Sequence, residues 1–170
     1  MDNKSSIVWV AGFFDGEGCF SIDLRKEPTS KLGFSCYPRI RIALQQSDKF
    51  VLEKIQVLLG GKISTRNPQK SWRKGAKPQS LWSIYGWKDC LRISKTIQPH
   101  LILKAERCII FIKIIEKVLN ERKISKTKKW NEKLLVEVCE LRDKLNRDRS
   151  TFRHSNYLDS KALKQKLGLV

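Results

Sequence analysis

The sequence has few of the residues that build zinc sites or disulfide frameworks. Its five cysteines, at positions 19, 36, 90, 108 and 139, never form a Cys-x-x-Cys pair, and His100 and His154 are the only histidines. Structural zinc needs closely grouped Cys or His ligands, and a disulfide framework needs paired cysteines. Neither is indicated, so the core must come from ordinary hydrophobic packing. A chain of 170 residues is long enough for that as a single domain.

Long apolar runs are also missing. The strongest one, over residues 108–115, is too short to cross a bilayer. Residues 1–6 contain no apolar stretch of the kind that secretion signals carry, and they lead directly into the first predicted helix. We therefore expect no membrane partner and an intracellular location, in the prokaryotic cytoplasm or in the organelle that encodes the chain.

Acidic residues are the scarcer charge. The chain has 35 Lys and Arg against 17 Asp and Glu, which leaves a net charge of +18, and no acid occurs between Glu53 and Asp89. Such an excess predicts a polyanionic partner, and nucleic acid is the first candidate. The scarcity of histidine then argues against those nuclease classes that use histidine as general base or as several zinc ligands.

The most informative segment is residues 10–20, an apolar, helix-like run that leads into a carboxylate. Gly12 and Gly16 are four residues apart, so they fall on one helix face, where the missing side chains let a second backbone approach closely. Glu17 follows at once, so a close pair of such helices places a carboxylate at its tip. On its own, the string is equally compatible with a core helix and a tight turn at Asp15 and Gly16. It lacks the regular Asp spacing of a calcium loop.

The hydrophobic pattern alternates between helical and strand-like periods. Helical spacing predicts helices over 7–16, 48–59, 89–97, 104–119, 131–146 and, less regularly, 161–167. Ser5 or Ser6 and Asp48 are the expected N-caps, and Gly60 with Gly61 ends the second helix. Period-two alternation predicts strands over 19–25, 39–45, 62–67 and 80–87, and residues 121–129 read as a basic linker. This order favours a mixed α+β fold with an antiparallel four-stranded sheet and helices on one face.

The predicted strands each have an apolar face and a polar or basic face, because successive side chains point to opposite sides of a sheet. The polar face would stay open, and such a ribbon can enter the major groove of DNA, where Arg reads guanine and Gln reads adenine. Its strand residues are Ser21, Asp23, Arg25, Arg39, Arg41, Gln45, Lys62, Ser64, Arg66 and Ser83. The loop before the last strand adds bases suited to phosphate contacts, namely Lys70, Arg73, Lys74 and Lys77. We interpret Trp72, Trp82 and Trp87 as packing aromatics.

These features resemble the LAGLIDADG homing endonucleases. In residues 10–18, Val-Ala-Gly-Phe-Phe-Asp-Gly-Glu-Gly, apolar side chains stand at the leading positions of the signature, Gly16 at the small position and Glu17 at the second acid. The order of elements over 7–119 is also that of one half of such an enzyme, whereas 120–170 match only as a loosely helical extension. The chain has one copy of the acid motif, and each active site in the family uses two. The resemblance thus implies a homodimer, formed through Trp9, Gly12, Phe13 and Gly16.

The resemblance also implies an activity and its residues. Glu17 of each protomer, aided by the main-chain carbonyl of Gly16, would bind Mg²⁺, and Mn²⁺ or Ca²⁺ could occupy the same sites. Gln46 matches the polar residue that orders active-site water, Lys104 matches the basic residue that polarises the nearby solvent, and Lys49 is a further basic candidate. Aspartate is commoner where Glu17 stands, a difference that preserves metal ligation. The implied reaction is that of intron-encoded enzymes, a double-strand break with short 3′ overhangs in a long, near-palindromic site of double-stranded DNA.

Three other interpretations stay open at this point. Intron maturases and DNA-binding regulators use the same scaffold to bind RNA or DNA without cutting it. Another nuclease fold could use Asp89 with the triplet Glu121-Arg122-Lys123, although such triplets are frequent by chance in so charged a chain. A structural RNA-binding protein would explain the charge, but not a paired-glycine helix that leads into an acid.

Overall fold

The computed structural model describes residues 3–68, 75–125, 129–146 and 158–169. The helices are α1 (Asn3–Glu17), α2 (Lys49–Leu59), α3 (Trp87–Ile97), α4 (Ala105–Ser125), α5 (Glu132–Leu145) and α6 (Ser160–Lys166). The strands are β1 (Gly18–Lys26), β2 (Phe34–Gln45), β3 (Lys62–Arg66) and β4 (Gln79–Tyr85). Two short 3₁₀ turns, η1 (Gln46–Asp48) and η2 (Gln98–His100), precede α2 and α4.

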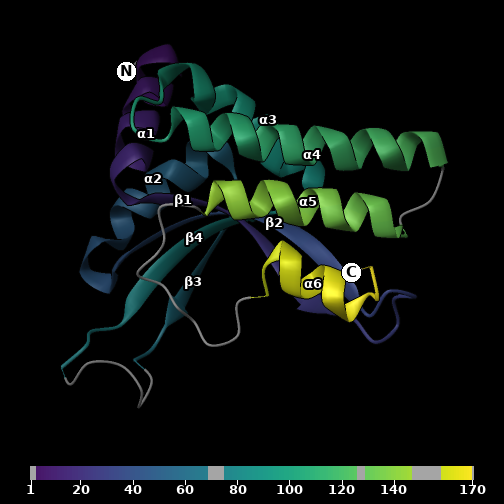
Figure 1. Cartoon of the computed structure of the whole chain (residues 1–170). Helices are drawn as coiled ribbons and strands as arrows, with labels where there is room; N and C mark the ends of the chain where they lie inside the picture. The colour runs from purple at the N-terminus through teal and green to yellow at the C-terminus, as the bar shows by residue number, and fades with distance from the viewer. Residues whose placement is uncertain (1–2, 69–74, 126–128, 147–157, 170) are drawn as a thin grey trace.

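The predicted mixed α+β fold is confirmed. The four strands form one antiparallel sheet in the order β1-β2-β4-β3. In Figure 1, α1, α3, α4 and α5 lie above this sheet, and the β1–β2 hairpin and the β3–β4 pair extend downward on opposite sides. The long helices α4 and α5 run antiparallel to one another, and α6 packs on α5. The sheet therefore has a helix-covered face and an open face.

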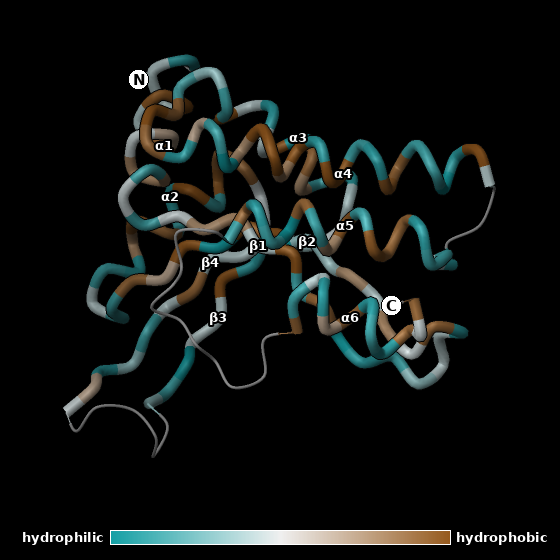
Figure 2. The backbone as a smooth tube through the Cα atoms, in the orientation of Figure 1, coloured by the Kyte–Doolittle hydropathy of each residue, from teal (hydrophilic) through white to brown (hydrophobic). Residues whose placement is uncertain are grey.

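Even-numbered residues of β1, β2 and β4 build the core on the covered face, and Ile63 of β3 joins them because it pairs with Trp82. Phe20 of β1, Ile40 of β2 and Trp82 of β4 are almost completely buried. The ring of Phe20 lies 4.7 Å from that of Phe14 in α1 and 5.1 Å from that of Phe111 in α4. Figure 2 shows the hydrophobic segments gathered where helices meet strands, while the free ends of β3 and β4 are mostly hydrophilic. The period-two pattern thus predicted the correct faces of the sheet.

Most predicted element boundaries hold within a few residues, with three corrections. Helix α1 begins at Asn3, so Ser5 and Ser6 lie inside it and do not cap it, and Asp15 and Gly16 stay helical. Strand β2 begins at Phe34, because its register with β1 extends to the pair Lys26 and Phe34. Helix α4 continues through 121–125, where a basic linker was expected, because the Arg122 side chain packs over Trp87 and Trp130.

Helix α2 shows one wrong and one correct end prediction. Asp48 precedes the helix, but its side chain makes no capping hydrogen bond and instead accepts one from Ser47 Oγ at 3.1 Å. The helix ends as predicted at Gly60, which has a φ of +77°. At Gly61, with a φ of +96°, an added Cβ would lie 2.6 Å from the Ile84 side chain. Only glycine fits this turn, since it combines a left-handed backbone with close packing.

No helix within the described residues has both the length and the apolar character needed to cross a membrane.

Candidate active site and nucleic-acid interface

The end of α1 is anchored by Asp15. This carboxylate is only 8% exposed and accepts hydrogen bonds from three consecutive backbone amides that lead into α4: Ile102 at 2.6 Å, Leu103 at 3.2 Å and Lys104 at 2.9 Å. Burial on its own raises the pKa of Asp15, but these amides and the Lys104 charge together hold it below its usual value. Asp15 therefore ties the motif helix to α4. The sequence interpretation gave it no such role.

The Lys104 side chain in turn binds the end of α1. Its ammonium donates to the main-chain carbonyls of Phe14 at 3.1 Å and Gly16 at 3.2 Å, and also to that of Asp15. These are unpaired carbonyls at the C-terminal end of α1, where the helix dipole favours a positive charge. Partial burial is the main cause of a lowered pKa at Lys104. Although Lys104 immediately precedes a helix N-terminus, its charge serves the end of another helix.

Glu17 is the last residue of α1 and follows directly on the carbonyls that Lys104 binds. Its side chain is exposed and makes no hydrogen bond or ion pair with any described residue. Gly18 follows without a linker and begins β1, packed so tightly against the Phe14 ring that an added Cβ would collide with it. The missing side chain at Gly18 thus lets the strand start directly beneath the helix, which delivers Glu17 at the tip.

The end of β2 lies at the same edge of the sheet, because Gly18 pairs with Ile42 in the register. Gln45 is the last residue of β2, opposite Gln79, and Gln46 begins the η1 turn, with its amide donating to the Pro78 carbonyl at 3.0 Å. Gln45 therefore belongs to the open face of the sheet and Gln46 to the turn beside the motif. Lys49, predicted as a further basic site residue, pairs with Glu53 on the surface of α2 at 2.9 Å.

The glycine face of α1 is open. An added Cβ at Gly12 or Gly16 meets nothing within 4 Å, and Trp9, 36% exposed, stacks on Phe13 with ring centres 6.0 Å apart. A groove of about 490 Å³ continues this apolar face towards α2, where Val57 and Leu58 line it together with Trp9. The four predicted dimer residues thus share one accessible surface of the chain.

All ten predicted strand residues lie on the open face, since the registers align their odd and even positions across β1, β2, β4 and β3. Some of them are already engaged. Asp23 binds Arg39 at 3.2 Å and Arg25 at 3.3 Å, and Arg25 lies over the Tyr37 ring at 5.1 Å. Ser83 is only 5% exposed, so its hydroxyl lies beneath its neighbours. Arg41, opposite Ser83, stays partly exposed near the centre of the face.

The remaining predicted residues are the basic loop residues and the tryptophans, and they differ in where they lie. Lys70, Arg73, Lys74 and Trp72 lie outside the described residues, whereas Lys77 is exposed beside β4. Trp82 is a core residue, as predicted, and Trp87 is half-buried against Trp130. The sequence interpretation missed residues that share the open face, namely Tyr37, Gln79, Leu81 and Tyr85. Their alternation with buried neighbours was the signal that could have found them.

A single chain offers one carboxylate at the motif. Among the described residues, no three His, Cys, Asp or Glu side chains cluster closely enough to hold a metal ion. Glu17 and the Gly16 carbonyl are oxygen donors of the kind that Mg²⁺ prefers. The Gly16 carbonyl accepts from Lys104 but keeps a second lone pair. The donors present therefore fit an ion only if further oxygen ligands are supplied.

Comparison with known proteins agrees with this geometry. Residues 10–85 match the sequence profile of the LAGLIDADG endonuclease family. The homing endonuclease I-CvuI, crystallised with its target in the presence of Ca, shares 22% identity and a TM-score of 0.74, over 99% of this chain and 98% of that chain. A second I-CvuI structure, with the I-CreI target, is described as having Mg present and the DNA not cleaved.

Two further structures differ in the share of their chains that is covered. The archaeal intron-encoded homing endonuclease I-Vdi141I, complexed with DNA, shares 18% identity and a TM-score of 0.76, over 98% of this chain and 97% of that chain. I-SmaMI, bound to uncleaved DNA with calcium, shares 19% identity and a TM-score of 0.66, over 83% of this chain but only 45% of the I-SmaMI chain. No curated protein sequence matches the chain. The fold is that of the homing endonucleases, and the resemblance predicted from the motif is confirmed.

Proposed function

We propose, from the premise that residues 10–85 match the LAGLIDADG endonucleases and that the chain has the homing-endonuclease fold, that this protein is a site-specific DNA endonuclease. The observation that carries the proposal is the end of α1. There the helix has an open face at Gly12 and Gly16 and ends at the exposed carboxylate of Glu17. Hydrogen bonds of Asp15 and Lys104 fix this helix end against the start of α4. A structural RNA-binding protein has no need for this arrangement.

The active unit in this proposal is a homodimer. A two-fold axis between two α1 helices would make Gly12 and Gly16 meet their own copies and bring two Glu17 carboxylates together. The open space at both glycines, the exposed Trp9 ring and the partly exposed Phe13 ring support this contact. Chain lengths also support a dimer. The match spans 98% of the I-CvuI chain but only 45% of the I-SmaMI chain, so two copies of this chain together correspond to about one I-SmaMI chain. The donor set that one chain lacks is then supplied by the second.

Glu17 of both protomers, with the Gly16 carbonyls, would hold the divalent ions, and Mg²⁺ is the ion of choice. Bound there, such ions neutralise charge on the phosphate and activate water for hydrolysis. Gln46, in the turn beside the motif, would orient a water molecule through its side-chain amide. Lys104 is proposed as a positioning residue, because its ammonium holds the last carbonyls of α1 and so fixes the direction of Glu17.

The open face of the sheet is the proposed DNA surface. With +18 charges per chain, doubled in the dimer, long-range attraction to DNA is strong. Arg41, near the centre of the face, is suited to base contacts in the major groove, and Lys77, in the adjoining loop, is suited to phosphate contacts. Asp23 restrains Arg25 and Arg39 and so presets the directions of their guanidinium groups. A long, near-palindromic site follows from the two-fold symmetry, and 3′ overhangs follow from the family resemblance.

The decisive experiment is cleavage of a randomised library built on inverted repeats, with and without Mg²⁺, followed by sequencing of the ends. We expect an enriched two-fold-related site, 3′ overhangs and loss of cutting in Glu17→Gln. Glu116→Gln makes the same change at a surface ion pair of α4 and should cut normally. Enrichment by binding without any cutting would overturn the nuclease and favour a maturase or a DNA-binding regulator, with RNA as the next ligand to test.

A further inference from the structure

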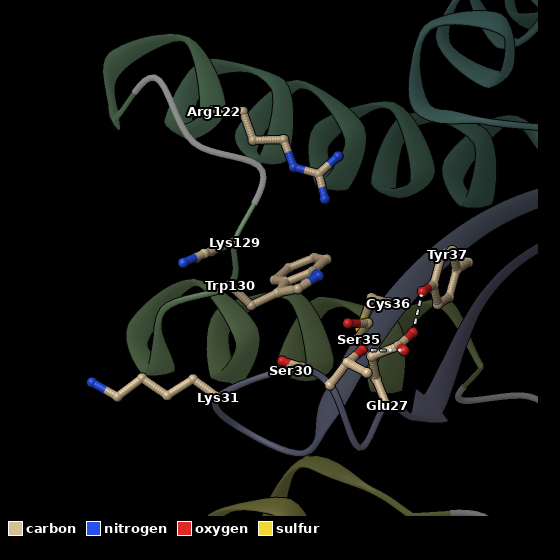
Figure 3. Close-up of a pocket in the computed structure, with 10 residues that line it drawn as sticks. Glu27, Ser30, Lys31, Ser35, Cys36, Tyr37, Arg122, Lys129 and Trp130 are labelled. Carbon is tan, nitrogen blue, oxygen red and sulfur yellow. Dashed lines mark hydrogen bonds between the residues drawn. The ribbon is translucent and has the colours of Figure 1, made fainter.

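A second cavity lies at the far end of the β1–β2 hairpin. It has a volume of about 520 Å³, within the range of small-molecule sites, and Glu27, Tyr37, Arg122 and Trp130 line it (Figure 3). Glu27 follows the last residue of β1, whereas Glu17 precedes the first. At about 3.3 Å per strand residue, the cavity is about 30 Å from the motif carboxylate. It is therefore separate from the candidate active site.

Arg122 supplies the positive charge of this cavity. Its guanidinium lies 5.3 Å from the ring centre of Trp87 and 5.5 Å from that of Trp130. No described carboxylate or carbonyl accepts a hydrogen bond from it, and partial burial lowers its pKa. In Figure 3 the group points from α4 into the space above Tyr37 and Glu27. Stacking holds its plane, which leaves its N–H edge for an anion or a base acceptor.

Trp130 and Glu27 supply the other two features. The Trp130 ring lies in the middle of the cavity in Figure 3, between Arg122 and the strands. The Glu27 carboxylate accepts from Tyr37 Oη at 2.7 Å and from Thr29 Oγ1 at 2.9 Å, and these two hydrogen bonds lower its pKa. Each carboxylate oxygen keeps a further lone pair, so Glu27 can accept a neighbouring pair of N–H donors.

We propose that this cavity binds an unpaired nucleotide of a single-stranded nucleic acid, with guanine as the preferred base. The base stacks on Trp130, its N–H edge donates to Glu27, and the phosphate meets Arg122. Paired bases of a duplex are already stacked and hydrogen-bonded, so only an unpaired base can enter. The surrounding strand would continue past Lys31 and Lys129, which line the rim. This site goes beyond the proposed cleavage of duplex DNA and does not depend on it.

Fluorescence anisotropy with short, labelled single strands tests the proposal. Guanine-containing RNA and DNA strands are compared with strands that lack guanine, with a duplex of the same length and with free GMP as competitor. We expect Trp130→Leu to weaken binding of the guanine strand roughly 10- to 100-fold. We expect Glu27→Gln to remove the preference for guanine while adenine strands bind as before. The RNA and DNA arms then identify which strand the site takes.

Arg122→Gln has a matched control in Lys123→Gln. Lys123 is the next residue of α4, is exposed and does not line the cavity. Its substitution therefore removes one positive charge outside the cavity. Melting temperatures verify folding, and Glu27→Gln, on the surface of the hairpin, tests the site without disturbing the aromatic cluster. Equal losses in Arg122→Gln and Lys123→Gln would overturn the proposal in favour of general charge attraction. So would equal affinity for the duplex, or competition by GMP in the absence of any strand preference.

Discussion

Asp15 and Lys104 each hold the end of the other's helix. The Asp15 carboxylate accepts from the Lys104 amide at 2.9 Å, and the Lys104 ammonium donates to the main-chain carbonyl of Asp15. The first contact gives a partner to a backbone amide at the start of α4, and the second gives a partner to a backbone carbonyl at the end of α1. The pair thus fixes the motif helix against α4 at the point where Glu17 emerges, so stability and site geometry depend on the same two residues.

The Asp15 carboxylate makes stability depend on acidic pH. Its pKa is lowered in the folded chain, so its contribution is complete above the unfolded-state value of about 3.9 and is lost as pH falls through the lower, folded-state value. Asp15→Asn removes the charge. It should lower the free energy of unfolding by about 1–3 kcal/mol near neutral pH, and the difference from wild type should shrink below about pH 4. Urea unfolding at several pH values measures both. A difference that stayed constant down to pH 2 would contradict the role of the ionised carboxylate.

Lys104 should matter more for cleavage than for folding. Lys104→Met removes the cation from the α1 carbonyls. It should lower the free energy of unfolding by only about 1 kcal/mol, because the hydrogen bonds from the backbone amides to Asp15 remain. Cleavage by this variant should fall at least tenfold, and Lys104→Arg should recover part of the rate because a guanidinium can reach the same carbonyls. Initial rates with saturating Mg²⁺ and melting temperatures separate the two effects. If Met and Arg variants cut equally, the positive charge has no role in positioning Glu17.

The sequence predicted the sheet and the motif better than the contacts that connect them. Strand faces follow from a period of two, which local residues encode, so Arg41 and Gln45 were placed correctly. The partners of Asp15 are 87 to 89 residues away in the chain, and no local pattern shows that a carboxylate inside a helix will accept their amides. The extension of α4 past residue 121 had the same cause, because Arg122 packs on aromatic side chains from other segments.

The three glycines of the motif should respond differently to alanine. An added methyl at Gly12 or Gly16 meets nothing within the chain, and alanine favours a helix, so both variants should fold with equal or slightly greater stability. In the proposed dimer the same methyl groups would separate two backbones, so sedimentation equilibrium should show weaker association. Gly18→Ala is the contrasting control, since its Cβ collides with the Phe14 ring and should destabilise the fold itself. Unchanged association in both Gly12→Ala and Gly16→Ala would remove α1 as the dimer contact.

Arg41 and Lys77 should affect DNA binding in different ways. Arg41 projects from the middle of the open face and forms no ion pair with a described residue, so it is available to a base edge. Arg41→Ala should weaken binding of the selected site by about 1–3 kcal/mol and relax the base preference at one position in each half-site. Lys77, exposed in the loop before β4, has no such specificity.

Lys77→Ala should therefore weaken all sequences about equally and reduce the slope of log affinity against log salt by about one per protomer. Binding titrations of the selected site and a scrambled site at several salt concentrations, with Glu17→Gln as the background to prevent cutting, distinguish the two behaviours. Arg39→Ala is a useful third variant, because it also removes one of the two ion pairs of Asp23 and leaves that acid on the DNA-facing surface with Arg25 as its remaining partner. If Arg41→Ala changed only the salt slope, the face would be an electrostatic platform without sequence readout at that position.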